Sequence, residues 1–158
     1  KRQVQKRTDA LLNCGGTHRP EWFHRKLGDI LYEGCGVARD EAGLLDALTK
    51  VRELREEFWR DVKVVGTGNR LNQELEKAGR VADFIELGEV MILDALDRRE
   101  SAGAHFRNEY ATEAGEAKRN DGDWCAVSAW ETRPDGTKVR HSEPLSFSLI
   151  DLQVRDYR

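Results

Sequence analysis

A single long helical pattern, from about Leu71 to Ser101, constrains the fold of this chain more than any other stretch. At about 1.5 Å per residue, a helix of that length spans roughly 45 Å. Apolar residues occupy two of its faces instead of one, so we expect other elements to cover it on two sides, as the central rod of a bundle. One face carries Leu71, Leu75, Ala78, Ala82, Ile85, Ile92 and Leu96, and the other carries Val81, Phe84, Gly88, Met91 and Ala95.

Three further helices are predicted before the long one. A short helix beginning near Val4 ends at Cys14-Gly15-Gly16, because glycine readily adopts the left-handed conformation that ends helices. Pro20 is suited to open a second helix, which continues to Gly34. Asp40 is a good N-cap for a third helix, which runs to about Val62 and carries charges of both signs on a solvated outer face.

After Tyr110 the pattern becomes extended. Residues 112–123 are polar and predict an exposed loop, and apolar residues then alternate from Trp124 to Trp130. A turn at Arg133–Gly136 and a second extended run at residues 138–141 complete a predicted β-hairpin. Leu145, Phe147 and Leu149 then alternate with serines, which indicates either another strand or an extended tail on a neighbouring surface.

Composition excludes several classes of protein. The 158 residues fit one domain, and although 35% of them are charged, the formal net charge is only -3, which argues against nucleic-acid binding. The apolar runs are far shorter than the ~20 residues that cross a bilayer, so we expect no membrane insertion and no signal peptide. Three cysteines without C-x-x-C spacing favour a reducing compartment. The chain opens on Lys1 as if inside a helix, so we expect a piece of a longer protein.

Three patterns resemble chemical motifs, but a simpler interpretation is preferred for each. Gly66-Thr67-Gly68 lacks the third glycine and the preceding strand of a dinucleotide loop, so it is interpreted as a helix connection. His18 and His24 lack the companions of a zinc site and are interpreted as surface or capping residues. Cys35 is interpreted as a small buried packing residue, not as a reactive thiol.

The strongest candidate site is a cluster of charged residues where the long helix ends. The cluster surrounds Gly103 and admits two interpretations: an ion-pair network that closes the helix, or a docking surface whose arginines bind carboxylates and carbonyls of another domain. Its members are Arg98, Arg99, Glu100, Ser101, His105 and Arg107.

The same stretch carries a family resemblance. Residues 100–107, Glu-Ser-Ala-Gly-Ala-His-Phe-Arg, resemble the E-S-x-G-x-H-x-R signature of the succinate dehydrogenase and fumarate reductase flavoproteins, which L-aspartate oxidase shares in part. Residues 27–33 with the G-x-x-R turn at Gly36–Arg39, residues 71–75 and residues 95–99 are similar to the family as well. Ala102 and Ala111 replace an arginine and a proline common in the family, and these departures resemble a subgroup of bacterial succinate dehydrogenases.

The resemblance implies a fold and a division of labour. It implies a mainly α structure, an antiparallel three-helix bundle (spectrin-repeat-like) over residues 1–110, with a loop, a short β-hairpin and an extended tail over 111–158 that pack on the bundle. FAD and the catalytic residues of the family belong to upstream flavin and capping domains, so no catalytic, cofactor-binding or metal residue is predicted here. We predict only a docking set: Arg99, Glu100, Ser101, Gly103, His105 and Arg107.

The implied parent is an FAD-dependent succinate dehydrogenase that passes electrons through iron-sulfur clusters to quinone. Its implied partners are the upstream domains, an iron-sulfur subunit and membrane anchor subunits, and its place is the cytoplasmic, inner face of the bacterial plasma membrane. The piece itself is expected to be inert. The alternatives are a stand-alone helical interaction module, or the same domain from fumarate reductase or L-aspartate oxidase. Replacing His105 or Arg107 is expected to loosen docking more than it lowers the melting temperature of the bundle.

Overall fold

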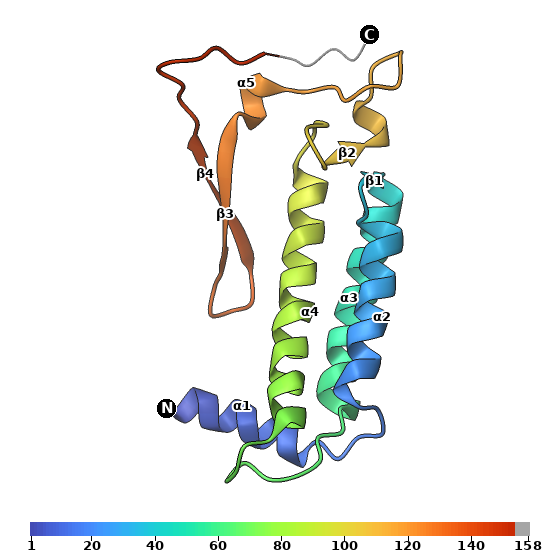
Figure 1. Ribbon diagram of the computed structural model, residues 1–158, viewed down its shortest axis with the longest axis vertical. Coiled ribbons are helices and arrows are strands. Elements are labelled where there is room, and N and C mark those ends of the chain that lie inside the picture. The colour runs from blue at the N-terminus through green and yellow to red at the C-terminus, as the bar shows by residue number, and fades with distance from the viewer. Residues whose placement is uncertain (154–158) are drawn as a thin grey trace. The chain divides into compact units, whose positions relative to one another are not determined.

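The computed structural model describes residues 1–153 and is mainly helical (Figure 1). The chain divides into two compact units, Lys1–Arg119 and a second beginning at Asn120. The first unit contains α1 (Arg2–Asn13), α2 (Pro20–Gly34), β1 (Ala38–Arg39), α3 (Glu41–Asp61), α4 (Gln73–Asp97), β2 (Phe106–Arg107) and the 3-10 helix η1 (Asn108–Tyr110). The second contains α5 (Asp121–Trp124), β3 (Ala126–Thr132) and β4 (Lys138–Pro144).

Local capping explains where the helices begin. Pro20 is the first residue of α2, where its missing N–H costs nothing. The Asp40 carboxylate accepts a hydrogen bond of 2.8 Å from the Gly43 N–H and caps α3. Asn72 caps α4 in the same way, through a bond of 3.1 Å from the Leu75 N–H. The predicted start of α4 at Leu71 is therefore two residues early, because Leu71 lies outside the cap.

The end of α4 differs more from the prediction. The pattern indicated a helix to Ser101, but the backbone leaves the helical conformation at Arg98, with φ -75° and ψ 97°. Glu100 and Ser101 are buried instead in the folded segment that follows. The spacing of residues 98–101 could not show whether they continue the helix or form a turn. A turn that folds back onto the helix buries the same residues.

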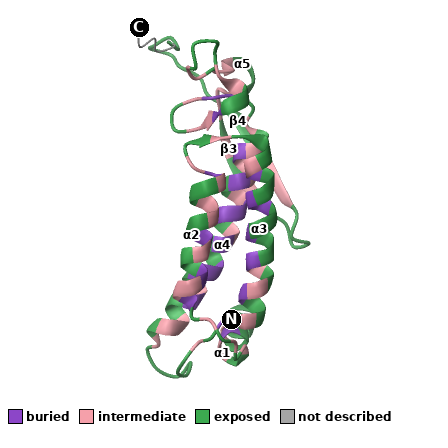
Figure 2. Ribbon diagram, turned by 90° about the vertical axis from the view of Figure 1, so that its right-hand side faces the viewer, coloured by how far each residue is buried: buried purple, intermediate pink, exposed green. Residues whose placement is uncertain are grey.

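Helices α2, α3 and α4 each pack against the other two. Figure 1 shows α2 and α4 running in one direction and α3 in the opposite one. The buried residues lie on the surfaces that face one another (Figure 2). Phe23 of α2 and Phe58 of α3 are completely buried and meet edge to face, with ring centroids 5.2 Å apart. Cys35 is buried beside this core, as predicted, and burial raises the pKa of its thiol.

The expected second covered face of α4 is only partly covered. Val81, Gly88 and Ala95 are buried, and a Cβ at Gly88 would meet methyl carbons of Leu27 and Leu31 at 3.3 Å, which explains the small residue there. Phe84 and Met91 on the same predicted face are exposed. The expectation of cover along the whole of this face is therefore wrong at these two positions.

One carboxylate lies inside the bundle. Glu89 of α4 is 4% exposed and accepts hydrogen bonds from Arg52 Nε at 2.7 Å and from Arg55 Nη1 at 2.5 Å, both on α3. Burial by itself would raise the pKa of Glu89, but the hydrogen bond from Arg52 and the charge of Arg55 outweigh burial and lower it. Two arginines of the face of α3 that was predicted to be solvated therefore reach across to α4, although the Arg52 side chain stays 50% exposed.

A second polar contact lies at the carboxyl end of α3. The ring Nδ1 of His18 lies 2.5 Å from Oδ2 of Asp61, and Thr17 donates to the same carboxylate from its N–H at 2.9 Å. These bonds, the hydrogen bond from His18 first, lower the pKa of Asp61 to about 2. His18 also stacks on Trp22, with ring centroids 4.0 Å apart. The capping interpretation of His18 fits this placement.

The second unit contains the predicted β-hairpin. Strands β3 and β4 pair antiparallel from Ala126 opposite Pro144 to Thr132 opposite Lys138. Gly136 in the turn has φ 87°, a conformation that glycine adopts without strain. Trp124 was predicted to begin the first strand but lies in α5, with the Arg140 guanidinium 4.8 Å from its ring centroid. Residues 145–153 contain no strand, which leaves the extended tail as the better description of that described part.

The mainly helical fold with a carboxyl-terminal β-hairpin is confirmed. The predicted division at residues 110 and 111, and the packing of the tail on the bundle, stay predictions. Within residues 1–153, no helix combines the length and the apolar character needed to cross a bilayer.

The buried carboxylate gives a first prediction. Glu89→Gln should lower the free energy of unfolding by about 1–3 kcal/mol near pH 7, because two charge-assisted hydrogen bonds are weakened. The folded-state pKa of Glu89 lies below its ordinary value of 4.5, so its contribution is complete above that pH and is lost as the pH falls through the folded-state pKa. Denaturant unfolding should therefore show the difference between variant and wild type shrinking below about pH 4.

Glu56→Gln is the matched control, because Glu56 is an exposed residue of α3. It should change the free energy of unfolding by less than about 0.5 kcal/mol, both near pH 7 and in acid. If Glu89→Gln lowers the free energy of unfolding by the same amount in acid as near pH 7, the negative charge of Glu89 is not what stabilises the bundle.

Candidate functional site

The predicted docking residues lie in a segment that folds back over the end of α4. Gly103 has φ 58°, in the left-handed region that favours glycine, and a Cβ there would meet no neighbour. Around it, Ala102 and His105 exchange both backbone hydrogen bonds, at 2.8 and 3.1 Å. The glycine of the signature is therefore required by the tight turn and not by close packing.

Ser101 fixes the two arms of this turn to each other. Its hydroxyl accepts a hydrogen bond of 2.8 Å from the Arg107 N–H and donates one of 3.1 Å to the Arg107 carbonyl. Its own N–H donates to the Lys118 carbonyl at 2.9 Å. Ser101 is fully buried, so these bonds satisfy groups that water cannot reach. The serine of the signature is a structural residue of the turn.

Arg107 closes the carboxyl end of α4. Its Nη1 donates to the carbonyls of Ala95 at 2.8 Å and Leu96 at 3.3 Å, which have no partner within the helix. Only 2% of Arg107 is exposed, so its positive charge lies directly at the negative end of the helix dipole.

Glu109 extends the same contact to α3. Its Oε2 accepts from Arg107 Nε at 3.1 Å, and its Oε1 accepts from the Glu41 N–H, the first residue of α3, at 2.5 Å. Burial would raise the pKa of Glu109, but the bond from the Glu41 N–H and that from Arg107 outweigh burial and lower it. A cation at the carboxyl end of α4 and an anion at the amino end of α3 are thus joined in one ion pair. Sequence reasoning missed Glu109, because the sequence does not show that Arg107 is buried and needs a carboxylate beside it.

The G-x-x-R turn after α2 lies beside this segment. Strands β1 and β2 pair in parallel, Ala38 with Phe106 and Arg39 with Arg107. The Phe106 N–H donates to the Val37 carbonyl at 3.1 Å, and Arg39 Nη2 donates to the Ala104 carbonyl at 3.3 Å. Two sequence motifs more than 60 residues apart therefore form one structure, which sequence spacing did not predict.

The remaining polar residues of the segment also bind within the chain. Arg98 donates from Nε at 2.8 Å and Nη2 at 2.6 Å to Oε1 of Glu100, which is 2% exposed. His105 Nε2 donates to the Arg98 carbonyl at 3.0 Å. Burial, and then the charges of Arg39, Arg98 and Arg107, lower the pKa of His105 against the opposing effect of that hydrogen bond, so the neutral ring is favoured.

The six predicted docking residues therefore divide into two groups. Glu100, Ser101 and Arg107 are buried, and their polar groups hold this segment together. Arg99 and Gly103 are exposed and His105 is half-buried, so these three present atoms to solvent. Of the two interpretations of the cluster, the network that closes the helix describes the buried group. A docking surface stays a prediction for the three residues that reach the solvent.

The described residues contain no glycine-rich dinucleotide loop between a parallel strand and a helix. FAD-binding folds hold the pyrophosphate on a glycine-rich loop between a parallel strand and a helix. The parallel strands among residues 1–153 are β1 and β2, of two residues each, and neither precedes such a loop. The same part of the chain contains no cluster of three or more potential metal ligands.

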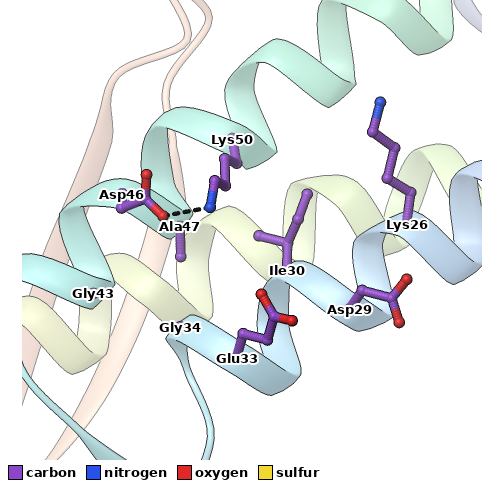
Figure 3. Close-up of a pocket in the computed structure, with 9 residues that line it drawn as sticks. All are labelled: Lys26, Asp29, Ile30, Glu33, Gly34, Gly43, Asp46, Ala47 and Lys50. Atoms are coloured by element: carbon purple, nitrogen blue, oxygen red, sulfur yellow. Dashed lines mark ion pairs between the residues drawn. The ribbon is translucent and has the colours of Figure 1, made fainter.

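A pocket of about 290 Å³ lies between α2 and α3. Figure 3 shows the ion pair between Lys50 and Asp46 at one side of it, 2.6 Å long. Lys26 is paired with Glu57 at 2.9 Å, and Asp29 and Glu33 add two carboxylates from α2.

The position of Arg107 gives a second prediction. Arg107→Lys should lower the free energy of unfolding by about 2–3 kcal/mol, because lysine cannot donate to two carbonyls and a carboxylate from one planar group. Chemical denaturation of the chain measures this, with Arg99→Lys as the exposed neighbouring control. Equal stability of the two variants would contradict the role of Arg107 in closing α4. Because replacing Arg107 is expected to destabilise the fold itself, it is a poor residue for testing docking.

Comparison with known proteins places this geometry in a family. The sequence profile described as fumarate reductase flavoprotein C-term matches residues 24–157. The succinate dehydrogenase flavoprotein subunit of Bacillus subtilis is 27% identical over 158 residues, which cover 99% of this chain and 26% of that protein. The fumarate reductase flavoprotein subunit of Haemophilus influenzae is 28% identical over 109 residues, 69% of this chain and 18% of that protein.

A solved structure agrees with these matches. Escherichia coli quinol fumarate reductase has a chain that superposes on 94% of this one with a TM-score of 0.79 and 25% identity, and the match covers 25% of that chain. The present chain thus spans about a quarter of the length of the curated relatives it matches. Because the family profile matches most of its residues, the chain belongs to the carboxyl-terminal domains of the succinate dehydrogenase and fumarate reductase flavoproteins.

Proposed function

We propose that this chain is the carboxyl-terminal helical domain of a succinate dehydrogenase flavoprotein subunit and that it positions the neighbouring domains without taking part in the chemistry. The choice of succinate dehydrogenase is supported by the coverage of the sequence alignments, whereas the fold is shared with a fumarate reductase chain that covers 94% of this one. The match to the Bacillus subtilis succinate dehydrogenase subunit covers 99% of the chain, whereas that to the Haemophilus influenzae fumarate reductase subunit covers 69%. The fold is best described, within this proposal, as an antiparallel, spectrin-repeat-like three-helix bundle with a hairpin and tail.

The proposed docking surface is the exposed part of the signature segment. Arg99, Gly103 and His105 are presented by a turn whose other residues are bound within the chain. A rigid support keeps the entropy lost on docking small, and the guanidinium of Arg99 can bind a carboxylate or a carbonyl of the partner. The proposed partner of this surface is the upstream flavin and capping part of the same subunit.

The chemistry of the whole protein belongs, in this proposal, to the parts outside this chain. FAD in the upstream domains oxidises succinate to fumarate, and electrons pass through the iron-sulfur clusters of a partner subunit to quinone. Membrane anchor subunits hold the complex on the cytoplasmic face of the bacterial plasma membrane. The role left for this domain is to fix positions, since catalysis that depends on geometry loses rate steeply when groups shift by about 1 Å.

The complete reading frame tests this function. The full-length protein should bind FAD and oxidise succinate with an artificial electron acceptor, and the 158-residue chain should show neither flavin absorbance nor turnover. A reading frame that begins near Lys1 without a flavin domain would instead support the stand-alone interaction module. A full-length enzyme that reduces fumarate but barely oxidises succinate would favour fumarate reductase, and L-aspartate oxidation would favour that relative.

The docking surface gives a third prediction. In the full-length flavoprotein, Arg99→Glu should raise the fraction of unassembled or flavin-depleted subunit about fivefold, which corresponds to a loss of about 1 kcal/mol. Arg70→Glu is the matched control, because Arg70 is an exposed arginine of the connection between α3 and α4. Gel filtration with flavin absorbance measures both variants, and equal assembly would count against docking through Arg99.

A further inference from the structure

We propose that His105 is a pH-sensitive switch of the signature segment, residues 98–107. The neutral ring keeps the segment closed over the end of α4 and against β1, and protonation of the ring opens it. The proposal concerns contacts within this chain and does not depend on the proposed function. It assigns His105 a role in regulation that is separate from docking.

The backbone holds the ring of His105 in one place. Ala102 and His105 exchange hydrogen bonds of 2.8 and 3.1 Å across the turn, and the ring Nε2 donates to the Arg98 carbonyl at 3.0 Å. The next residue, Phe106, donates its N–H to the Val37 carbonyl at 3.1 Å. Because the backbone is bound on both sides of the ring, the ring cannot move away from a neighbouring charge unless the segment itself opens.

The surroundings of the ring favour its neutral form. The ring is half-buried, and burial is the strongest influence, because it disfavours the charged imidazolium. The charges of Arg39 on β1, Arg98 at the end of α4 and Arg107 on β2 act in the same direction. The hydrogen bond to the Arg98 carbonyl opposes them but does not outweigh them, so the pKa of His105 lies below its ordinary value of 6.5.

Two of these three cations are already neutralised. Arg98 pairs with Glu100, and Arg107 pairs with Glu109. Arg39 makes no ion pair within the described residues 1–153. A further positive charge in this cluster therefore meets one guanidinium that no carboxylate balances, and their repulsion destabilises the closed segment.

Arg39 also makes the contact on which that repulsion acts. Its Nη2 donates to the Ala104 carbonyl at 3.3 Å, one residue before His105. Its Nη1 lies 3.7 Å from the Cys35 sulfur, and its Nε is buried without a hydrogen-bond partner in the described part of the chain. Repulsion between Arg39 and a protonated His105 therefore opposes the side-chain contact that joins the segment to β1.

The other titratable groups at this end of the bundle are held by their own partners. Burial would raise the pKa of Glu109, but its hydrogen bonds outweigh burial and keep it below 4.5. Burial raises the pKa of the Cys35 thiol above 9.0, and Asp94 of α4 acts on that thiol in the same direction. Glu100 accepts two hydrogen bonds from Arg98, at 2.8 and 2.6 Å. Glu109 therefore stays charged and Cys35 neutral between about pH 5.5 and 7.5, where histidine titrates.

The direction of the effect follows from the pKa of His105. Because that pKa is lower in the closed segment than in an unfolded chain, the open segment binds the proton more readily. Opening therefore becomes easier as the pH falls below 6.5, and the effect is complete below the folded-state pKa. Above pH 6.5 the ring is neutral in both states and does not favour opening.

Two measurements on the full-length protein test the switch. Hydrogen–deuterium exchange at the C2 carbon of the imidazole, read by mass spectrometry, gives the pKa of His105 directly. We expect a lower value in the folded protein than in the same protein unfolded in denaturant. Backbone amide exchange of the peptide covering residues 98–107, corrected for the intrinsic effect of pH, should be about fivefold faster at about pH 5.5 than at about pH 7.5.

Three variants assign the response to its groups. His105→Gln keeps a donor for the Arg98 carbonyl but takes up no proton, so amide exchange of the segment should differ by less than about twofold between the two pH values. Arg39→Gln removes the unbalanced charge and should reduce the response to about twofold. His24→Gln is the matched control, because His24 is exposed on α2, and it should leave the fivefold response unchanged.

Each contrary outcome overturns the proposal. A folded-state pKa of His105 at or above the unfolded value would remove the driving force, and this measurement needs no variant that could misfold. Equal amide exchange of the wild-type segment at both pH values would show that the segment does not open. An acid response that persists in His105→Gln would assign it to another group. Equal acceleration in peptides from α3 and α4 would indicate general acid unfolding instead of a local switch.

Discussion

The ion pair between Arg107 and Glu109 is the contact on which the signature end of the bundle depends. Arg107 supplies donors to two carbonyls at the end of α4, and Glu109 accepts the first N–H of α3. Each charge thus lies at the helix end whose dipole favours it, and each pairs with the other. The turn at Gly103 and the hydroxyl of Ser101 place Arg107 there. Most of the family signature is explained by this closure of α4.

Two other polar contacts fix α3 along its length. Glu89 ties the middle of α4 to Arg52 and Arg55 of α3, and Asp61 ties the end of α3 to His18. Apolar side chains can pack in several registers, but a buried carboxylate with two arginines is satisfied in one register only. The apolar core supplies most of the favourable burial, and the polar contacts select one arrangement of the helices. A domain of this kind is suited to hold other parts in fixed positions.

Helix existence and capping could be read from the sequence, because apolar spacing and cap residues act locally. Pro20 and Asp40 stand at helix starts as predicted, whereas the cap at Asn72 was not recognised and the helix was expected from Leu71. The candidate site was less predictable. The signature was found as a segment, but the burial of Glu100, Ser101 and Arg107 was not, because the pattern of charges is the same for an exposed docking surface and for a closed internal network. Glu109 and the pairing of Arg39 with residue 107 were missed for the same reason.

The sequence alone therefore determined the helices, the hairpin, the absence of a recognised catalytic motif and the family resemblance, since each rests on residue types at short spacing. Only the tertiary structure decided which charges face inward, where α4 ends and which apolar residues stay exposed. Those outcomes depend on segments more than 60 residues apart that compete for the same hydrogen bonds and the same buried surface. A local sequence pattern cannot predict these outcomes, because distant parts of the chain determine whether a side chain is buried or exposed.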